Sequence, residues 1–285
     1  MMNINVAAPA KINLMLDITG KRADGYHTLT TVMQSVSLSD IVTISENNNG
    51  IISVRTNNSL IPSDEKNIAY KAAVEFIKTA NIQHNGLDIH IQKNIPSEAG
   101  LGGGSADAAA VLIGLNYLFD INLSKEQLCY IGVKIGADVP FCIVGGTKYC
   151  TGIGEIITEA SPLDECYIVI AKGTTGISTK SAFEKIDALG FNVDSDFNKY
   201  NGSVLSIKNY AYNKFELVAD NDDVNFIKEQ MVIMGAEYAA MSGSGSAVFG
   251  LFFNEIDAQK CTDSLCKTNL FAALCKPIPN GAEIM

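Results

Sequence analysis

The sequence has no tryptophan, no Cys-x-x-C pair and no long apolar run. A membrane helix needs about 20 consecutive apolar residues, so we expect no transmembrane segment. The sequence has seven cysteines, which is an odd number, and their spacing is not that of metal ligands. This pattern favours buried, reduced thiols over disulfides or a zinc site. The stretch 1–18 has no charged segment ahead of its apolar residues, and Lys11 interrupts them, so we expect no signal peptide and a cytoplasmic protein.

Basic residues are also scarce, because 21 Lys and Arg stand against 31 Asp and Glu and the formal net charge is −10. Proteins that bind nucleic acid usually carry a basic face, so we expect no nucleic-acid partner. A small anionic ligand remains compatible with this balance, since backbone N–H groups and a few lysines can bind phosphate locally. The 285 residues suffice for two lobes with a substantial core, in a monomer or a homodimer.

The hydrophobic pattern predicts interleaved strands and helices. From Ile12 to Ile18 apolar residues occupy every second position, which is typical of a strand and places Lys11 and Asn13 on one face. Further strands are expected at 29–38, 40–45, 50–56, 87–95, 146–159 (a hairpin), 166–173, 236–253 (a strand pair) and 271–278, and helices at 66–80, 105–118, 124–136, 178–186, 222–235 and 255–268. The polar stretch 187–205 indicates a loop.

This irregular order favours an α+β fold of mixed α/β layers over a barrel. We expect a first domain at 1–160 and a second at 161–285, and the last strand is a candidate to pack back on the first lobe.

A glycine-rich loop precedes the helix expected at 105–118. Gly100 and Gly102 to Gly104 lie within five positions, and Ser105 is a suitable helix N-cap with Asp107 in the first turn. The first N–H groups of a helix lack internal partners and the helix dipole is positive there, so a strand, a glycine loop and a helix start together favour an anion site. Asp107 would repel a phosphate but could lie in the outer shell of a magnesium ion. The alternative is a tight connection without a ligand.

The loop matches neither common nucleotide signature. It has no Gly-Lys-Ser/Thr for a Walker loop, and it lies a third of the way along the chain, preceded by Pro96, rather than after the first strand.

Four stretches carry a more specific resemblance. The pattern P-x-x-x-G-L-G-G-G-S at 96–105 resembles the phosphate loop of the GHMP kinases, and MSGSGSAVFGLF at 241–252 resembles the third motif of that family. The stretches APAKINLMLDITGKRADGYHTL at 8–29 and IGADVPF at 135–141 resemble one branch of it. The resemblance implies a two-lobed fold, with a first lobe like domain 2 of ribosomal protein S5 and a ferredoxin-like second lobe.

The resemblance also implies transfer of the γ-phosphoryl group of ATP, with Mg²⁺, to an alcohol of a cytidine-diphosphate-linked sugar alcohol. The phosphate loop would hold the ATP phosphates with backbone donors, and the hydroxyl of Ser105 would also ligate Mg²⁺. The positions carried over for ATP are Pro96, Gly100, Leu101, Gly102, Gly103, Gly104, Ser105 and Ala106.

Catalysis would fall to two residues of the matched motifs. Asp138 would accept the proton of the substrate hydroxyl, and Lys11 beside it would keep it ionised and steer the attacking oxygen. By residue type alone, Asp138 could instead cap the turn before Pro140, and Lys11 could be a solvated strand lysine. Val139 precedes Pro140, so we expect extended backbone there.

The same resemblance implies how the substrate is bound. Tyr26 and Phe183 would stack on opposite faces of the pyrimidine, and His27 would hydrogen-bond the base edge. Phe183 could equally be a helix core residue. Gly152 and Gly154 would line the diphosphate. The full set of substrate positions is Asn13, Tyr26, His27, Ile153, Phe183, Gly243, Ser244 and Gly245, of which the last three also fit a plain hairpin turn.

Two positions depart from the branch pattern. Ala106 stands where the branch commonly has a second serine, and Lys214 stands where it usually has an acid. Two alternatives therefore stay open: another small-molecule kinase of the family, of the homoserine or mevalonate type, and a non-catalytic ligand-binding protein of the same fold.

Overall fold

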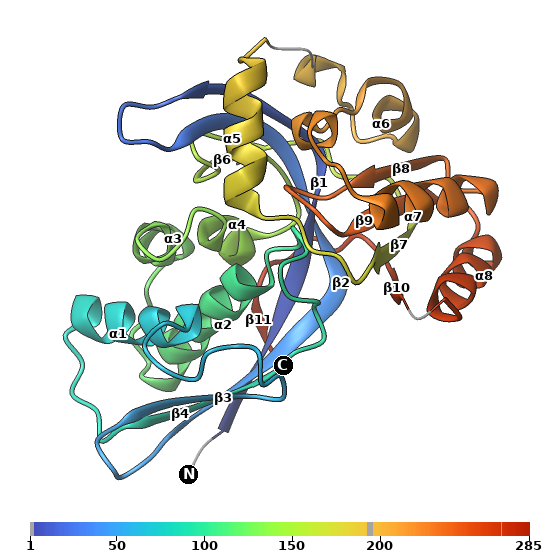
Figure 1. The fold of residues 1–285 in the computed structure, drawn as a ribbon. Coiled ribbons are helices and arrows are strands. Elements are labelled where there is room, and N and C mark those ends of the chain that lie inside the picture. The colour runs from blue at the N-terminus through green and yellow to red at the C-terminus, as the bar shows by residue number, and fades with distance from the viewer. Residues whose placement is uncertain (1–2, 193–195, 269) are drawn as a thin grey trace.

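The computed structural model describes residues 3–192, 196–268 and 270–285, which form two sheets with helices packed on them (Figure 1). The first sheet has seven strands in the described part of the chain, with the order β11-β1-β2-β4-β3 and with β5 and β6 attached to β2. Its strands are β1 (Asn3–Lys21), β2 (His27–Glu46), β3 (Ile52–Thr56), β4 (Leu87–Gln92), β5 (Thr147–Thr151), β6 (Ile156–Glu159) and β11 (Glu283–Ile284). The second sheet has the order β10-β7-β9-β8, formed by β7 (Tyr167–Lys172), β8 (Tyr238–Met241), β9 (Val248–Phe252) and β10 (Phe271–Cys275).

The long β1–β2 hairpin is the central element of the fold (Figure 1). Residues 8–18 of β1 are all buried, so both faces of this strand are covered and not only the apolar one. Register shifts between Pro9 and Lys11 and between Asn13 and Met15 bend the strand on either side of Lys11 and Asn13. Such bulges re-aim side chains, and here they flank the two polar residues that the sequence placed on one face.

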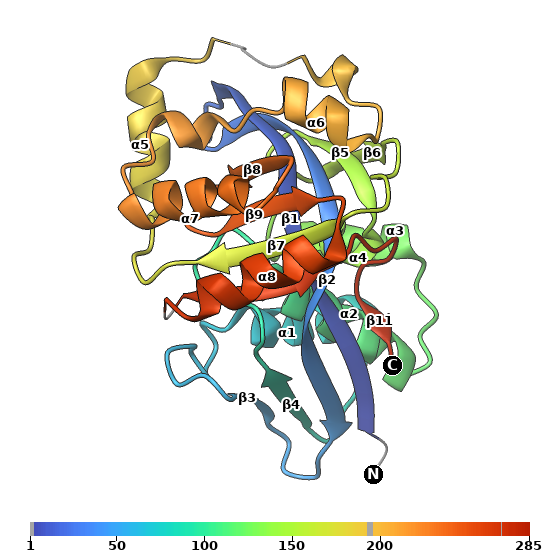
Figure 2. The ribbon, with the colours of Figure 1, turned by 90° about the vertical axis from the view of Figure 1, so that its right-hand side faces the viewer.

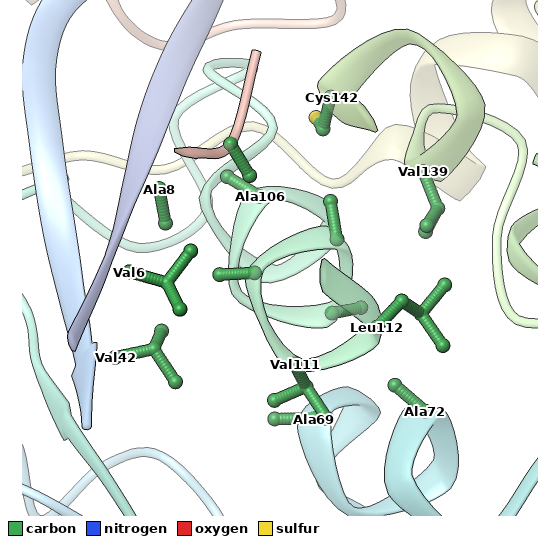
Figure 3. Packing of buried hydrophobic residues seen from close by; sticks show 14 of the residues in the cluster. Val6, Ala8, Val42, Ala69, Ala72, Ala106, Val111, Leu112, Val139 and Cys142 are labelled. Atoms are coloured by element: carbon green, nitrogen blue, oxygen red, sulfur yellow. The ribbon is translucent and has the colours of Figure 1, made fainter. Parts of the chain in front are cut away.

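The first lobe packs its helices on one face of the seven-stranded sheet. These helices are α1 (Ile68–Ala80), α2 (Gly103–Leu118), α3 (Lys125–Val133) and α4 (Val139–Val144). Helix α2 lies at the centre, with Ala106 and Ala108 fully buried. Figure 3 shows it enclosed by Val6 and Val42 of the sheet and by α1 and α4. The small side chains at the start of α2 let neighbouring elements approach it closely on several sides. More of its surface is therefore buried than the one apolar face that the sequence predicted.

The second lobe has the ferredoxin-like arrangement. One helical segment connects β7 to β8 and another connects β9 to β10, and the resulting strand order is that of a split βαβ unit. Figure 2 shows α7 and α8 in front of this sheet. The helical elements of the lobe are α5 (Thr179–Leu189), α6 (Val204–Tyr210), α7 (Asp222–Ile233), α8 (Glu255–Cys266) and the short 3₁₀ turns η1 (Phe197–Lys199) and η2 (Lys214–Leu217). The expected α+β class with two lobes is confirmed.

A shared hydrophobic core joins the two lobes. Ile12 and Leu14 of β1 belong to the same buried cluster as Ile168 of β7 and Phe249 of β9. The chain also returns to the first lobe at its end, where β11 pairs with β1 through Val6 and Ile284. The β1–β2 hairpin is therefore held in place by both lobes, which matters for the polar residues in its middle.

Some local expectations were wrong. The two strands expected at 29–38 and 40–45 are one continuous strand, β2, and β11 was not expected. The stretch 187–205, expected to be a loop, includes η1 and the start of α6, while residues 193–195 lie outside the described residues. Val139 begins α4 instead of taking extended backbone, because Pro140 then lies in the first turn, where its missing N–H costs nothing.

Lys214, one of the two departures from the branch pattern, is buried. Lys214 is 2% exposed and its Nζ lies 3.6 Å from Oδ1 of the buried Asp17, so this departure from the branch pattern provides a positive charge for a buried acid.

All seven cysteines are free. No helix of the described chain is both long and apolar enough to cross a bilayer.

Candidate active site

The glycine loop leads into the buried start of α2. The helix begins at Gly103 with Gly102 as its N-cap, at a φ of 70° that favours glycine. Ser105 is therefore not the N-cap, as the sequence suggested, but the third residue of the helix. The first bond within the helix runs from the N–H of Ala106 to the carbonyl of Gly102. The N–H groups of Gly103 to Ser105 precede it, so the start of α2 has the donors that an anion needs.

Both lobes hold the glycine loop in place. From the first lobe, the N–H of Lys11 donates to the carbonyl of Leu101 at 3.0 Å. From the second lobe, the hydroxyl of Ser242 donates to the carbonyl of Gly100 at 3.0 Å. Gly100 has a φ of 74°, and a Cβ there would lie 2.0 Å from the carbonyl oxygen of Ser242. Only glycine at position 100 allows this approach, so the stretch 241–252 can pack against the glycine loop and hold it.

Two cavities meet at this loop. A cleft of about 1070 Å³ lies between the lobes, and a second cavity of about 410 Å³ lies on the other side of the loop. Glu98, Gly100, Gly102 and Ser105 line both of them. A ligand in the smaller cavity can therefore reach the larger one across the helix start.

Lys11 and Asp138 meet in the larger cleft. Nζ of Lys11 lies 3.6 Å from Oδ2 of Asp138 and donates to Oδ1 of Asn13 at 2.7 Å. The lysine is 5% exposed, so it is not the solvated strand lysine of the alternative interpretation. A Cβ on Gly102 would lie 3.0 Å from Cγ of Lys11, so the bare glycine leaves room for the lysine stem beneath the loop.

Asp138 precedes α4 but does not cap it. Its side chain makes no capping hydrogen bond, and its backbone is helical instead of extended. The carboxylate is 30% exposed, so it faces both Lys11 and the open cleft. A carboxylate that is paired with an ammonium group and open to a ligand can accept a proton from an alcohol.

Asn13 is fixed from several directions. Its Nδ2 donates to Oγ1 of Thr31 at 2.8 Å, and that hydroxyl donates to the carbonyl of Met15. The backbone N–H of Asn13 donates to Oγ of Ser242 at 3.3 Å. Asn13 is 2% exposed and its Oδ1 orients the ammonium group of Lys11; it also lines the cleft, so its part in substrate binding stays a prediction.

Asp107 lies in a buried cluster with Lys93 and Asp40 and also lines the smaller cavity, so its place in the outer shell of a magnesium ion stays a prediction. Its Oδ2 lies 2.6 Å from Nζ of Lys93, which also donates to the buried Asp40. Burial raises the pKa of Asp107 to about 8, against the opposing charge of Lys93. Burial acts to lower the pKa of Lys93, but the charges of Asp107 and Asp40 outweigh it and raise this pKa. The three side chains connect α2 to β2 and to the segment after β4.

The aromatic residues lie at the far end of the cleft. His27 stacks on Phe183, with ring centroids 4.3 Å apart and planes 14° from parallel. Tyr26 is 60% exposed and lines the same cleft. Phe183 also meets Phe215 edge-on at 5.0 Å. One face of Phe183 therefore carries His27, and because Phe183 also lines the cleft, its stacking on the pyrimidine opposite Tyr26 stays a prediction.

The remaining expected residues lie around the same cleft. Gly243, Ser244 and Gly245 line it, and Oγ of Ser244 lies 2.8 Å from Oγ1 of Thr179 at the start of α5. Ile153 lines it as well. Gly152 and Gly154, expected to line the diphosphate, line neither cavity: a Cβ on Gly154 would lie 3.6 Å from Oδ1 of Asp138, and the carbonyl of Gly152 accepts from the N–H of Leu29.

The structure thus places nearly all of the expected site residues on the two cavities. Pro96, Leu101, Gly103 and Gly104 line the smaller cavity. Ala106 lines neither, because it is fully buried in the core.

Sequence reasoning missed several cleft residues. Lys21, Asp187 and Glu98 line the cleft, and Ser242 joins the loop to β1. Asp187 lies outside the four stretches that carry the family resemblance, so nothing in the sequence singled it out. Ser242 lay inside the quoted third motif, but a serine beside glycines gives no sign of its distant partner.

A magnesium ion would find few protein ligands here. Within the described ranges, no group of three or more His, Cys, Asp or Glu side chains is placed to hold a metal. Mg²⁺ commonly keeps several waters and binds through substrate phosphates with one or two protein groups. Ser105, which lines both cavities, fits that mode of binding.

Comparisons with known proteins agree with this geometry. The family model of the GHMP kinases N terminal domain matches residues 67–146, and that of the GHMP kinases C terminal matches residues 215–269. A protein of Clostridium botulinum named 4-diphosphocytidyl-2-C-methyl-D-erythritol kinase is 41% identical over 275 residues, which are 92% of this chain and 95% of that protein. A protein of Caldicellulosiruptor saccharolyticus with the same name is 45% identical over 265 residues, 90% of this chain and 91% of that protein. A crystal structure of 4-(cytidine 5'-diphospho)-2C-methyl-D-erythritol kinase matches with a TM-score of 0.81 at 28% identity, covering 96% of this chain and 98% of the other.

Proposed function

The chain belongs to the GHMP kinase family of ATP-dependent small-molecule kinases, and from this premise we propose that it phosphorylates the 2-hydroxyl of 4-diphosphocytidyl-2-C-methyl-D-erythritol. This reaction belongs to the non-mevalonate route to isoprenoid precursors. Identities of 41% and 45% over nine-tenths of the chain to proteins named for this activity support the assignment. The observation that carries the chemistry is the Lys11–Asp138 pair, which faces the cleft beside the start of α2.

In the proposed reaction, Asp138 takes the proton of the substrate hydroxyl as the oxygen attacks the γ-phosphorus of ATP. The bond from the γ-phosphorus to the bridging oxygen breaks, and ADP leaves. Lys11, oriented by Asn13, offsets the charge of Asp138 and of the developing oxyanion. Such positioning is effective because phosphoryl transfer depends mainly on alignment and charge neutralisation.

The ATP phosphates would lie on the N–H groups of Gly103 to Ser105, with the nucleoside in the smaller cavity. Ser105 would hold Mg²⁺ together with the phosphates, and when bound the ion neutralises phosphate charge. The second serine of the branch pattern is missing, but Ala106 is buried in the core and could not present a hydroxyl to the cleft without a change in packing.

The test is direct. Purified protein with ATP, Mg²⁺ and the cytidylyl substrate should form ADP and the 2-phosphorylated product, which mass spectrometry and ³¹P NMR identify. Homoserine and mevalonate serve as competing alcohols. Turnover of either but not of the cytidylyl substrate would reassign the chain to another type of the family, and no turnover of any alcohol would favour a non-catalytic ligand-binding protein.

A further inference from the structure

Asp187 links the two lobes at the aromatic end of the cleft. It lies on α5, whereas His27 opens β2, and Figures 1 and 2 both show α5 beside that end of the β1–β2 hairpin. Oδ1 of Asp187 lies 2.6 Å from Nε2 of His27, and Oδ2 lies 2.5 Å from Nζ of Lys21. The carboxylate therefore binds one residue from each strand of the hairpin.

These contacts fix the ring of His27. The imidazole is stacked on Phe183 and its side chain is 8% exposed. Because an ionised carboxylate can only accept, Nε2 of His27 must carry the proton in this hydrogen bond. Nδ1 makes no hydrogen bond to any described residue and is not buried from solvent, so it is the ring atom left to a ligand in the cleft.

We propose that Asp187 is a positioning residue that makes Nδ1 of His27 a hydrogen-bond acceptor for the exocyclic amine of cytosine. This inference rests on the proposed function and adds the means by which the base is selected. Lys21 balances the carboxylate, so the pair does not require a charged imidazole. In the neutral ring with its proton on Nε2, Nδ1 carries a lone pair.

The consequence is discrimination between two pyrimidines. Cytosine presents an N4 amine that donates to this lone pair. Uracil presents an O4 acceptor at the same position, so two lone pairs would face each other. A site that matches a donor with an acceptor rejects the analogue that lacks the donor, because its own polar atom is then left unpaired.

The first experiment measures the tautomer without any substrate. The chain has three histidines, so ¹⁵N signals of the imidazole nitrogens are few, and His27→Gln identifies those of His27. At pH 8 we expect the proton on Nε2 in the native chain and a mixture of both tautomers in Asp187→Ala. A proton on Nδ1 in the native chain, or an unchanged tautomer in Asp187→Ala, overturns the proposal.

The second experiment compares kcat/KM for the cytidine-diphosphate and uridine-diphosphate forms of the substrate. Asp187→Ala should reduce the preference for the cytidine form by about 10-fold or more, through KM rather than kcat, and Asp187→Glu should keep part of it. Lys185→Ala is the matched control, because Lys185 lies on the same helix but does not line the cleft, and its exposed Nζ donates to the carbonyl of Val218 at 3.3 Å.

The outcomes separate the two levels of inference. An unchanged preference in Asp187→Ala, or an equal loss in Lys185→Ala, overturns the role of Asp187 while the kinase activity stands. A native chain that turns over neither nucleotide form overturns the proposed function and the selectivity together, and the tautomer measurement then reports on the His27–Asp187 contact alone.

Discussion

Nζ of Lys11 and Oδ2 of Asp138 lie 3.6 Å apart, although one residue is in the middle of β1 and the other precedes α4. Asn13 orients the lysine, and Gly102 leaves space for its stem. The pair is therefore a product of packing between the sheet, the glycine loop and α4. Its position at the meeting point of the two cavities leads to the following predictions.

Asp138→Asn should lower kcat by roughly 10²–10⁴-fold with little change in KM for the alcohol, because the amide keeps the shape but cannot accept the proton. Steady-state kinetics give both constants, and calorimetry gives the substrate affinity. Asp120→Asn, in the turn after α2, is the control and should behave as the native chain. Near-native turnover of Asp138→Asn would remove the general base from the mechanism.

Gly103→Val should weaken ATP binding at least 10-fold, because the side chain would occupy space at the start of α2 that the phosphates need. A Cβ at this position already lies 3.1 Å from Cγ2 of Ile95, so the added methyl groups have little room on the protein side. Gly103→Ala should give a smaller loss. Thermal unfolding checks that both variants fold, and an unchanged ATP affinity in calorimetry would contradict the placement of the phosphates.

Tyr26→Ala should raise KM for the cytidylyl substrate about 5- to 150-fold, the range expected for the loss of one stacked base. Tyr26 is 60% exposed, so the thermal stability of the chain should hardly change. Tyr130→Ala, which removes another exposed tyrosine on α3, is the matched control. If KM stays the same, Tyr26 does not touch the base.

Asp107→Asn should change how stability depends on pH. Burial raises the pKa of Asp107 to about 8, above its value of about 4 in the unfolded chain. The folded chain then keeps a proton that the unfolded chain releases, so this contribution to stability is complete below about pH 4 and is lost as pH rises through about 8. Denaturant unfolding at pH 5 and pH 8 should show the native chain losing stability relative to Asp107→Asn. The exposed Asp164→Asn should run parallel to the native chain, and a parallel Asp107→Asn would show that Asp107 is ionised throughout.

Much of the local structure could be predicted because it depends on neighbours in the sequence. The alternation around Lys11 and Asn13 sets their common face, and Gly100 and Gly102 allow a backbone that other residues adopt only with strain. Expectations failed where tertiary contacts compete with local rules. At Val139 the rule for residues before proline gave way to a short buried helix, and at Ser105 the capping preference gave way to a glycine with positive φ.

The amino-acid sequence alone determined the α+β class, the glycine loop at a helix start and the family motifs, because each is a pattern of nearby residues. Only the tertiary structure decided that Lys11 meets Asp138, that Lys93 takes up Asp107 and that Asp187 holds His27. Those contacts join segments that no periodicity connects. The first two exist because helices of the first lobe pack on its sheet, where the buried ammonium of Lys93 would be costly to leave unpaired, and the third because α5 of the second lobe meets the β1–β2 hairpin.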